Sequence, residues 1–209
     1  MLNFNPLAFF LVLTFAMPSA VSAASRQTFH ARFKGLAATA DFDSADPSGC
    51  IDTSVSLTAI AGSFKEVGRP VVASGMFMFI FQANTCTQTQ LILASGSAPL
   101  VPGAFDIDNS LKSATLAVNL EVFDLVSNTS LPVAISLTWT GAGKLGSFEE
   151  HSNFRQPVFG FKSTSRVSGT FRPATVLGSV TLDDANLVSG SSIGGGLSST
   201  KQGEVDIVH

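Results

Sequence analysis

Hydrophobic and polar residues alternate along the segment 111–141, on both sides of a short polar stretch at 127–130. A period of two is typical of β-strands that bury one face and expose the other, and the polar Ser-Asn-Thr-Ser stretch suits a connection between two strands. The segment therefore predicts a long β-hairpin whose apolar face packs against a second sheet. The inward positions are Ala114, Leu116, Val118, Leu120 and Val122 in the first arm and Val133, Ile135, Leu137 and Trp139 in the second.

The same period recurs before this hairpin. Residues 28–43 predict one strand that bends at Gly35, or two strands, and residues 51–61 predict another. The stretch 71–81 is apolar at both odd and even positions, which is typical of a central strand covered on both faces. A strand over 86–95 follows, and Asn84 marks the turn before it.

The pattern is less regular after Gly141. Residues 143–157 are polar and predict a long excursion from the sheet, whereas 159–171 and 174–182 predict two further strands. Residues 187–203 are rich in glycine and serine, a low-complexity composition typical of a mobile segment. A short last strand over 204–208 is expected to close the domain by pairing with an edge, so that the chain holds roughly nine to eleven strands and no helix beyond its N-terminus.

The N-terminal residues 1–23 have the pattern of a secretory signal peptide. The apolar run 7–13 is shorter than the roughly 20 residues that cross a bilayer, and Val21-Ser22-Ala23 offers small residues for cleavage. We therefore expect residues 24–209 to form one exported domain with no transmembrane segment after cleavage. Its expected location is extracellular or periplasmic.

The composition favours an all-β protein. Only 13% of the residues are charged, which is few for the outer faces of long amphipathic helices, while Ser and Thr suit exposed strand faces. The formal net charge of −3 predicts no nucleic-acid partner and no polybasic membrane contact. The predicted fold is a single antiparallel β-sandwich of jelly-roll or immunoglobulin-like type, and the alternative is a closed β-barrel.

The chain has two cysteines, Cys50 and Cys86, and both follow the signal peptide. Because export leads to an oxidising compartment, we expect them to form a disulfide with a structural role.

Four carboxylates, at Asp41, Asp43, Asp46 and Asp52, lie within twelve positions. Hard oxygen ligands of this kind suit Ca²⁺, although their order is not that of an EF-hand. The alternative is a turn in which the carboxylates accept hydrogen bonds from backbone N–H groups, and this is the interpretation that the spacing favours.

Candidate catalytic groups are few. The only compact group is Glu149-Glu150-His151, which is near Arg155 and is expected in a solvated loop. The matches to GxGxxG at 141–146 and to GxSxG at 190–194 lack the helix and the downstream triad residues that those motifs need. Asn128 begins an N-glycosylation sequon at the expected hairpin tip.

The leading functional hypothesis is a secreted, non-enzymatic module for binding, adhesion or surface association, with an unidentified protein or carbohydrate as its ligand. Its expected surface is the loops around 41–52 and 147–157. One alternative is a secreted hydrolase that acts on polysaccharide or protein, which requires a cleft lined by two or more of a set of acidic and histidine side chains. The other is a carrier of an apolar small molecule, which requires the strand 76–81 to line a cavity. The hydrolase set is Asp41, Asp43, Asp106, Asp108, Glu149 and His151.

Overall fold

The structure is a computed structural model that describes residues 28–66, 69–156, 161–191 and 194–208, and it consists of eleven antiparallel strands. The predicted signal peptide, residues 1–23, lies outside the described residues. The all-β prediction is confirmed. The strands are β1 (Thr28–Ala45), β2 (Ile51–Glu66), β3 (Arg69–Asn84), β4 (Thr89–Pro99), β5 (Phe105–Ile107), β6 (Ser113–Asp124), β7 (Thr129–Gly141), β8 (Gly146–Gln156), β9 (Phe161–Leu182), β10 (Ala185–Ser191) and β11 (Gly194–Val208).

Hydrogen-bonded pairing runs continuously around the molecule in the order β1, β2, β3, β4, β6, β7, β9, β11 and back to β1. The narrowest step is the pairing of β4 with β6, which consists of Ala94 with Asp124 and Ser95 with Phe123. The remaining strands extend the sheet, because β5 pairs with β6 while β8 and β10 pair with β9.

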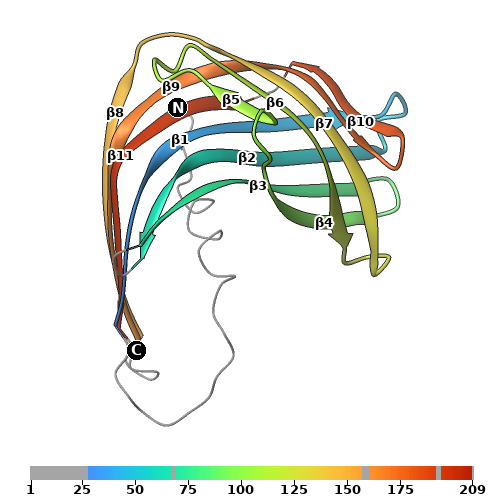
Figure 1. The fold of residues 1–209 in the computed structure, drawn as a ribbon. Helices are drawn as coiled ribbons and strands as arrows, with labels where there is room; N and C mark the ends of the chain where they lie inside the picture. Colours follow the sequence, from blue (N-terminus) through green and yellow to red (C-terminus); the bar gives the residue numbers. More distant parts are fainter. Residues whose placement is uncertain (1–27, 67–68, 157–160, 192–193, 209) are drawn as a thin grey trace.

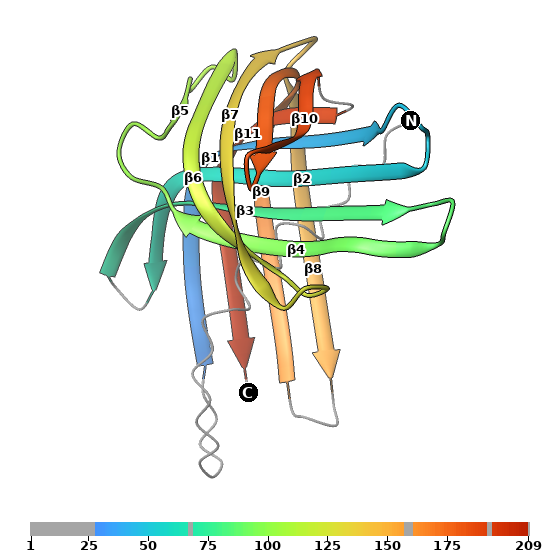
Figure 2. The same ribbon diagram turned by 90° about the vertical axis from the view of Figure 1, so that its right-hand side faces the viewer.

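The longest strands run through two parts of the molecule (Figures 1 and 2). In the first part, which we call the closed half, the ring of strands surrounds the core. In the second part, which we call the arm, the ends of six strands extend side by side beyond that core. The arm comprises residues 28–36 of β1, 60–66 of β2, 69–74 of β3, all of β8, 161–171 of β9 and 199–208 of β11.

The core lies inside the ring of strands in the closed half, an arrangement that is consistent with the predicted sandwich. Inner side chains of β1, β2 and β3 pack in one cluster with those of β6, β7 and β9. Trp139 is fully buried, and its indole Nε1 donates a hydrogen bond of 2.7 Å to the carbonyl oxygen of Thr39 on β1. The prediction that Trp139 faces inward is confirmed.

The predicted hairpin is also confirmed. β6 and β7 pair along their whole length, from Ser113 opposite Thr140 to Asp124 opposite Thr129. Their burial alternates with a period of two, because one face covers the core and the other faces solvent. Asn128 lies exposed in the turn with a positive φ of 58°, a conformation that asparagine tolerates.

The structure corrects the expectation that the strand 71–81 is covered on both faces. On β3, Met76, Met78 and Ile80 are buried, whereas Phe79 and Phe81 are exposed on the outer face. No described layer covers that face, so the apolar residues of this strand do not all belong to one core.

One expectation for the C-terminal third was wrong, because residues 146–156 are not an excursion from the sheet but form β8. Residues 204–208 are the end of the longer strand β11, which closes the ring by pairing with β1 and β9. The described part of the glycine- and serine-rich segment 187–203 likewise lies in β10 and β11.

Glycine is compatible with these strands because aromatic rings from neighbouring strands fill the space that its missing side chain leaves. The ring of Phe33 lies over Gly203, directly opposite it in the register, and the ring of Phe148 lies over Gly169 in the same way. Glycine and phenylalanine on different strands thus form cross-strand pairs, and this pairing cannot be seen in either segment alone.

The predicted disulfide between Cys50 and Cys86 is present, with its Cα atoms 5.2 Å apart. It connects the loop between β1 and β2 to the turn between β3 and β4. The backbone N–H of Thr85 also donates to the carbonyl oxygen of Cys50, at 2.7 Å. The β1–β2 loop and the β3–β4 turn are therefore joined by a disulfide and by a hydrogen bond. Such a disulfide is compatible with an oxidising compartment.

No helix in the described part of the chain has the length and apolar character needed to cross a membrane.

Candidate functional site

A group of polar and charged side chains lies on one face of the arm, where four neighbouring strands present them at alternate positions. The strands are β1, β11, β9 and β8, in that order across the sheet. We call this surface the charged face. Its residues are His30, Arg32, Glu204, Asp206, Thr164, Arg166, Asn153, His151 and Glu149.

The strand register arranges these residues in rows. In one row, Asp206 lies opposite both His30 and Thr164, and Thr164 lies opposite Asn153. Because side chains two residues apart on a strand share a face, the next row lies on the same surface.

The second row runs from Arg32 through Glu204 and Arg166 to His151. Arg32 Nε donates to Glu204 Oε1 at 2.9 Å. In the first row, the imidazole Nδ1 of His30 is hydrogen-bonded to the Asp206 carboxylate. The two acidic side chains of β11 are therefore held in place by basic side chains of β1.

A second pair of contacts links β8 to β9. Arg166 Nη2 donates to Glu149 Oε1 at 2.8 Å, and His151 Nε2 lies 3.1 Å from the same oxygen. The hydrogen bond from Arg166, followed by that from His151, lowers the pKa of the Glu149 carboxyl below its usual range. Glu149 is therefore ionised at neutral pH and serves to orient two basic groups.

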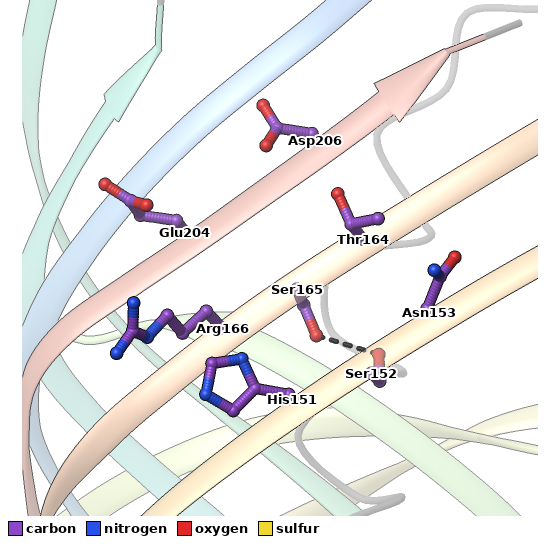
Figure 3. A pocket seen from close by; sticks show the side chains of 8 residues that line it. All are labelled: His151, Ser152, Asn153, Thr164, Ser165, Arg166, Glu204 and Asp206. Carbon is purple, nitrogen blue, oxygen red and sulfur yellow. Dashed lines mark hydrogen bonds between the residues drawn. The ribbon is translucent and has the colours of Figure 1, made fainter.

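Between these pairs lies a cavity of about 340 Å³, shown with its lining side chains in Figure 3. Glu204 and Asp206 come from β11, Arg166 and Thr164 from β9, and His151 and Asn153 from β8. The cavity thus offers carboxylate acceptors on one strand and guanidinium, imidazole, amide and hydroxyl groups on the others.

The predicted calcium ligands lie elsewhere. Asp41 and Asp43 are on β1 in the closed half, Asp52 is on β2, and Asp46 is in the loop between them. Asp41 accepts a hydrogen bond of 2.6 Å from Ser56 Oγ.

Asp46 orders its own loop. It accepts hydrogen bonds from Ser48 Oγ at 2.6 Å, from the backbone N–H of Ile51 at 2.7 Å and from that of Cys50 at 2.9 Å. The hydrogen bond from Ser48, followed by that from Ile51, lowers the pKa of Asp46. This loop is the hydrogen-bonded turn that the spacing of the four carboxylates favoured over a calcium site. Among the described residues, no three His, Cys, Asp or Glu side chains lie where they could hold one metal ion. Binding of Ca²⁺ stays a prediction, which calorimetry on the pure protein would check.

The hydrolase residues are dispersed over three regions. Asp41 and Asp43 lie on β1, Asp106 and Asp108 in and after β5, and only Glu149 and His151 lie together, on β8. Asp108 accepts hydrogen bonds from the side chain and backbone of Ser110, in that order of effect, which lower its pKa.

The carrier alternative gains no support from the geometry. A second hollow of about 660 Å³ lies over β6, β7 and β9, but small side chains such as Ala117, Ala134 and Ser136 contribute to its lining. Residues 76–81 line neither this hollow nor the cavity of the charged face.

Most of the charged face cannot be recognised from the sequence. Glu149 and His151 are close together in the chain, but Arg32, Glu204 and Arg166 lie in other segments. A signal is present, because polar residues at alternate positions occur in all four segments. It does not say which segments become neighbours.

The chain matches no protein-family model, no curated protein and no solved structure.

Proposed function

We propose that this protein is a secreted, non-enzymatic binding module and that the charged face binds a hydroxyl-rich ligand, with carbohydrate chains as the ligand class. Export is supported by the signal-like residues 1–23 and by a disulfide suited to an oxidising compartment.

The observation that carries the proposal is the two-row array of charged side chains around one cavity. A sugar hydroxyl both donates and accepts hydrogen bonds, so it is matched by a surface that alternates carboxylates with amide and guanidinium donors. The ion pairs hold Glu204 and Arg166 before a ligand arrives, which reduces the entropy lost on binding.

The same geometry disfavours catalysis by Glu149 and His151. A general acid or base works best when its pKa lies near the working pH. The pKa of Glu149 is lowered by Arg166 and His151, and its Oε1 atom is already engaged by both side chains. This arrangement suits orientation of a ligand better than transfer of a proton.

The test is to apply the oxidised mature protein to an array of neutral and acidic oligosaccharides and then to titrate the best ligand by calorimetry. Arg166→Ala and Glu204→Gln are expected to raise the dissociation constant at least about tenfold, the effect of losing one hydrogen bond to a charged group. Lys144→Ala, at an exposed position in the turn before β8, is the matched control and should bind like the parent.

Absence of any oligosaccharide binding would contradict the carbohydrate assignment. Binding that survives both substitutions would contradict the assigned surface. Melting temperatures of all variants show whether a loss of binding reflects a loss of folding.

A further inference from the structure

Arg172 on β9 differs from the other lysines and arginines because its side chain is only partly exposed. Every other Lys or Arg whose side chain the structure describes is exposed. The Nε atom of Arg172 is buried and has no hydrogen-bond partner. No ion pair joins its guanidinium to a carboxylate in the described part of the chain. Arg172 therefore carries an unpaired positive charge in a partly buried position.

An arginine cannot relieve such a position by losing its proton, because a guanidinium stays charged in proteins. Burial of an unpaired charge costs free energy unless a charge of opposite sign compensates for it. A buried polar atom without a partner is also uncommon, and a bound ion is one of its ordinary explanations. Arg172 thus lies where an anion would stabilise the protein.

The strand register places Arg172 where the core meets the charged face. Arg172 lies opposite Leu197 on β11, which is fully buried and lies opposite Ala38 on β1. Arg166 is six residues away on β9, so both arginines are on one face of the strand, about 20 Å apart. The charged face therefore continues the inner face of the closed half, and Arg172 is at its inner end.

Small hydroxyl side chains lie between Arg172 and the cavity. Thr170 shares the face of Arg172 and lies opposite Ser199 on β11 and Ser147 on β8. Hydroxyl groups both donate and accept hydrogen bonds, as sugar hydroxyls do. A sugar chain that occupies the cavity can therefore extend along β9 over hydroxyl groups until it reaches Arg172.

The acidic side chains on either side of this position are already engaged. Glu149 lies opposite Ser168, nearer to the cavity, and it accepts a hydrogen bond from Arg166. Asp108 lies in the loop before β6 and accepts hydrogen bonds from Ser110. Neither carboxylate forms an ion pair with Arg172.

The stem of Arg172 lies against the end of β7. A Cβ atom added to Gly141 would come within 2.7 Å of the arginine Cδ, so the glycine leaves the room that the stem occupies. The N–H of Ala142 donates to the carbonyl oxygen of Pro173 at 2.7 Å, which fixes the backbone beside the arginine. A side chain confined in this way loses little entropy when it binds a ligand.

The charge of the arm suits an anionic ligand. Its strand segments contain eight Lys and Arg against five Asp and Glu, although the whole chain has a formal net charge of −3. A local excess of positive charge raises the concentration of anions near the surface.

We propose that Arg172 forms a subsite for the carboxylate of an acidic sugar at the inner end of the charged face. A planar guanidinium offers parallel N–H donors that match the two oxygens of a carboxylate. The cavity then binds sugar hydroxyls while Arg172 binds the charged group, and chains that contain uronic acids are the ligand class. This inference rests on the proposed function, which it makes more specific.

Calorimetric titration of the oxidised mature protein compares an oligomer of a uronic acid with a neutral oligomer of the same length. The parent is expected to bind the acidic oligomer at least about tenfold more tightly, the effect of one hydrogen-bonded contact between charged groups. Arg172→Met keeps an apolar stem, removes the charge and should abolish this preference. Arg155→Met removes the same charge from an exposed position on β8 that does not line the cavity, and it should retain the preference.

Sodium glucuronate, a monosaccharide with one carboxylate, tests the subsite without the rest of a sugar chain. At the same ionic strength as a sodium chloride reference, it is expected to raise the melting temperature of the parent and of Arg155→Met but not that of Arg172→Met. Glucose is the neutral control and should not distinguish the three proteins. Melting temperatures without ligand show whether the variants are folded.

No rise in the melting temperature of the parent with glucuronate overturns the subsite, as does a rise that persists in Arg172→Met. A parent that binds both oligomers equally overturns the inference and leaves the proposed function intact. A preference for a sulfated oligomer over the uronic acid overturns the carboxylate assignment. Failure to bind any oligomer contradicts the proposed function, whereas the glucuronate result still decides whether Arg172 binds a carboxylate.

Discussion

At the scale of single residues, the buried carboxylate of Asp124 stabilises the contact between β4 and β6. It is the last residue of β6, where the ring of strands is narrowest. Burial opposes its ionisation and raises its pKa. Hydrogen bonds from Ser127 Oγ and from the backbone N–H groups of Leu93, Ser127 and Val126 outweigh that effect, so that the pKa falls to about 2.

The lowered pKa predicts the direction of the pH dependence. A carboxylate whose pKa is lower in the folded state stabilises the fold above its ordinary pKa of 3.8, and this contribution is lost as the pH falls through about 2. Asp124→Asn should therefore destabilise the protein by about 1–3 kcal/mol at neutral pH and flatten the loss of stability in acid. Urea unfolding at several pH values checks this, with the exposed Asp43→Asn as control. An unchanged acid profile would refute the role of Asp124.

Gly178 is a residue at which the backbone leaves no room for a side chain. It lies within β9 at a φ of 143°, and a Cβ atom there would come within 2.0 Å of the Ser136 carbonyl oxygen on β7. Gly178→Ala should destabilise the fold by about 1–3 kcal/mol, because the strand must shift away from β7. Gly75→Ala is the control, since its Cβ would lie 3.4 Å from the nearest atom. Equal melting temperatures for the two variants would contradict this account.

At the scale of elements, the β6–β7 hairpin and the long β9 determine how the two layers meet. β9 pairs with β7 over residues 174–182, with β8 over 161–171 and with β11 over 162–173, so one strand belongs to both the closed half and the arm. The hairpin in turn contacts β1 through Trp139. The position of the charged face relative to the core thus depends on β9 being one continuous strand.

Trp139→Phe tests the attachment of the hairpin to β1. The substitution keeps an aromatic ring but removes the donor to the Thr39 carbonyl and leaves a small cavity. We expect a loss of about 2 kcal/mol or more in the free energy of unfolding. Thr138→Val, at an exposed position of the same strand, should change it by less than about 0.5 kcal/mol. A similar midpoint of urea unfolding for both variants would show that the contact contributes little.

At the scale of the whole molecule, charge and apolar surface are distributed unevenly. The arm carries most of the basic residues and the cavity, while the closed half carries the disulfide, the exposed Phe79, Phe81 and Phe123 and most of the acidic residues. The molecule therefore presents two chemically different ends.

The disulfide is expected to contribute to the stability of the whole fold. It spans a sequence separation of 36 residues, for which the loss of chain entropy in the unfolded state corresponds to about 4 kcal/mol. Cys50→Ser with Cys86→Ser should lower the free energy of unfolding by roughly that amount, and a reducing agent should do the same to the parent but not to the variant. Urea unfolding with and without reductant measures both effects. Insensitivity of the parent to reductant would contradict the prediction.

The elements that could be predicted are those whose information is local. Alternation in 111–141 fixed the hairpin, its inner face and the burial of Trp139, and the two cysteines of an exported chain indicated the disulfide. The bend of β1 near Gly35 also agrees, because the register shifts between Phe33 and Gly35. In each case the residues that decide the structure are near one another in the sequence or are the only ones of their kind.

The tertiary structure alone decided which strands became neighbours. Glu204 and Asp206 lie far from Arg32 and Arg166 in the sequence, and only the position of β11 between β1 and β9 brings them together. The outward direction of Phe79 was decided in the same way, since an apolar strand does not reveal which of its faces a second layer will cover. The sequence by itself determined the strands and their inner faces, because a period of two is a property of one segment. The charged face and the outward direction of the exposed phenylalanines of β3 follow from long-range pairing, which no single segment contains.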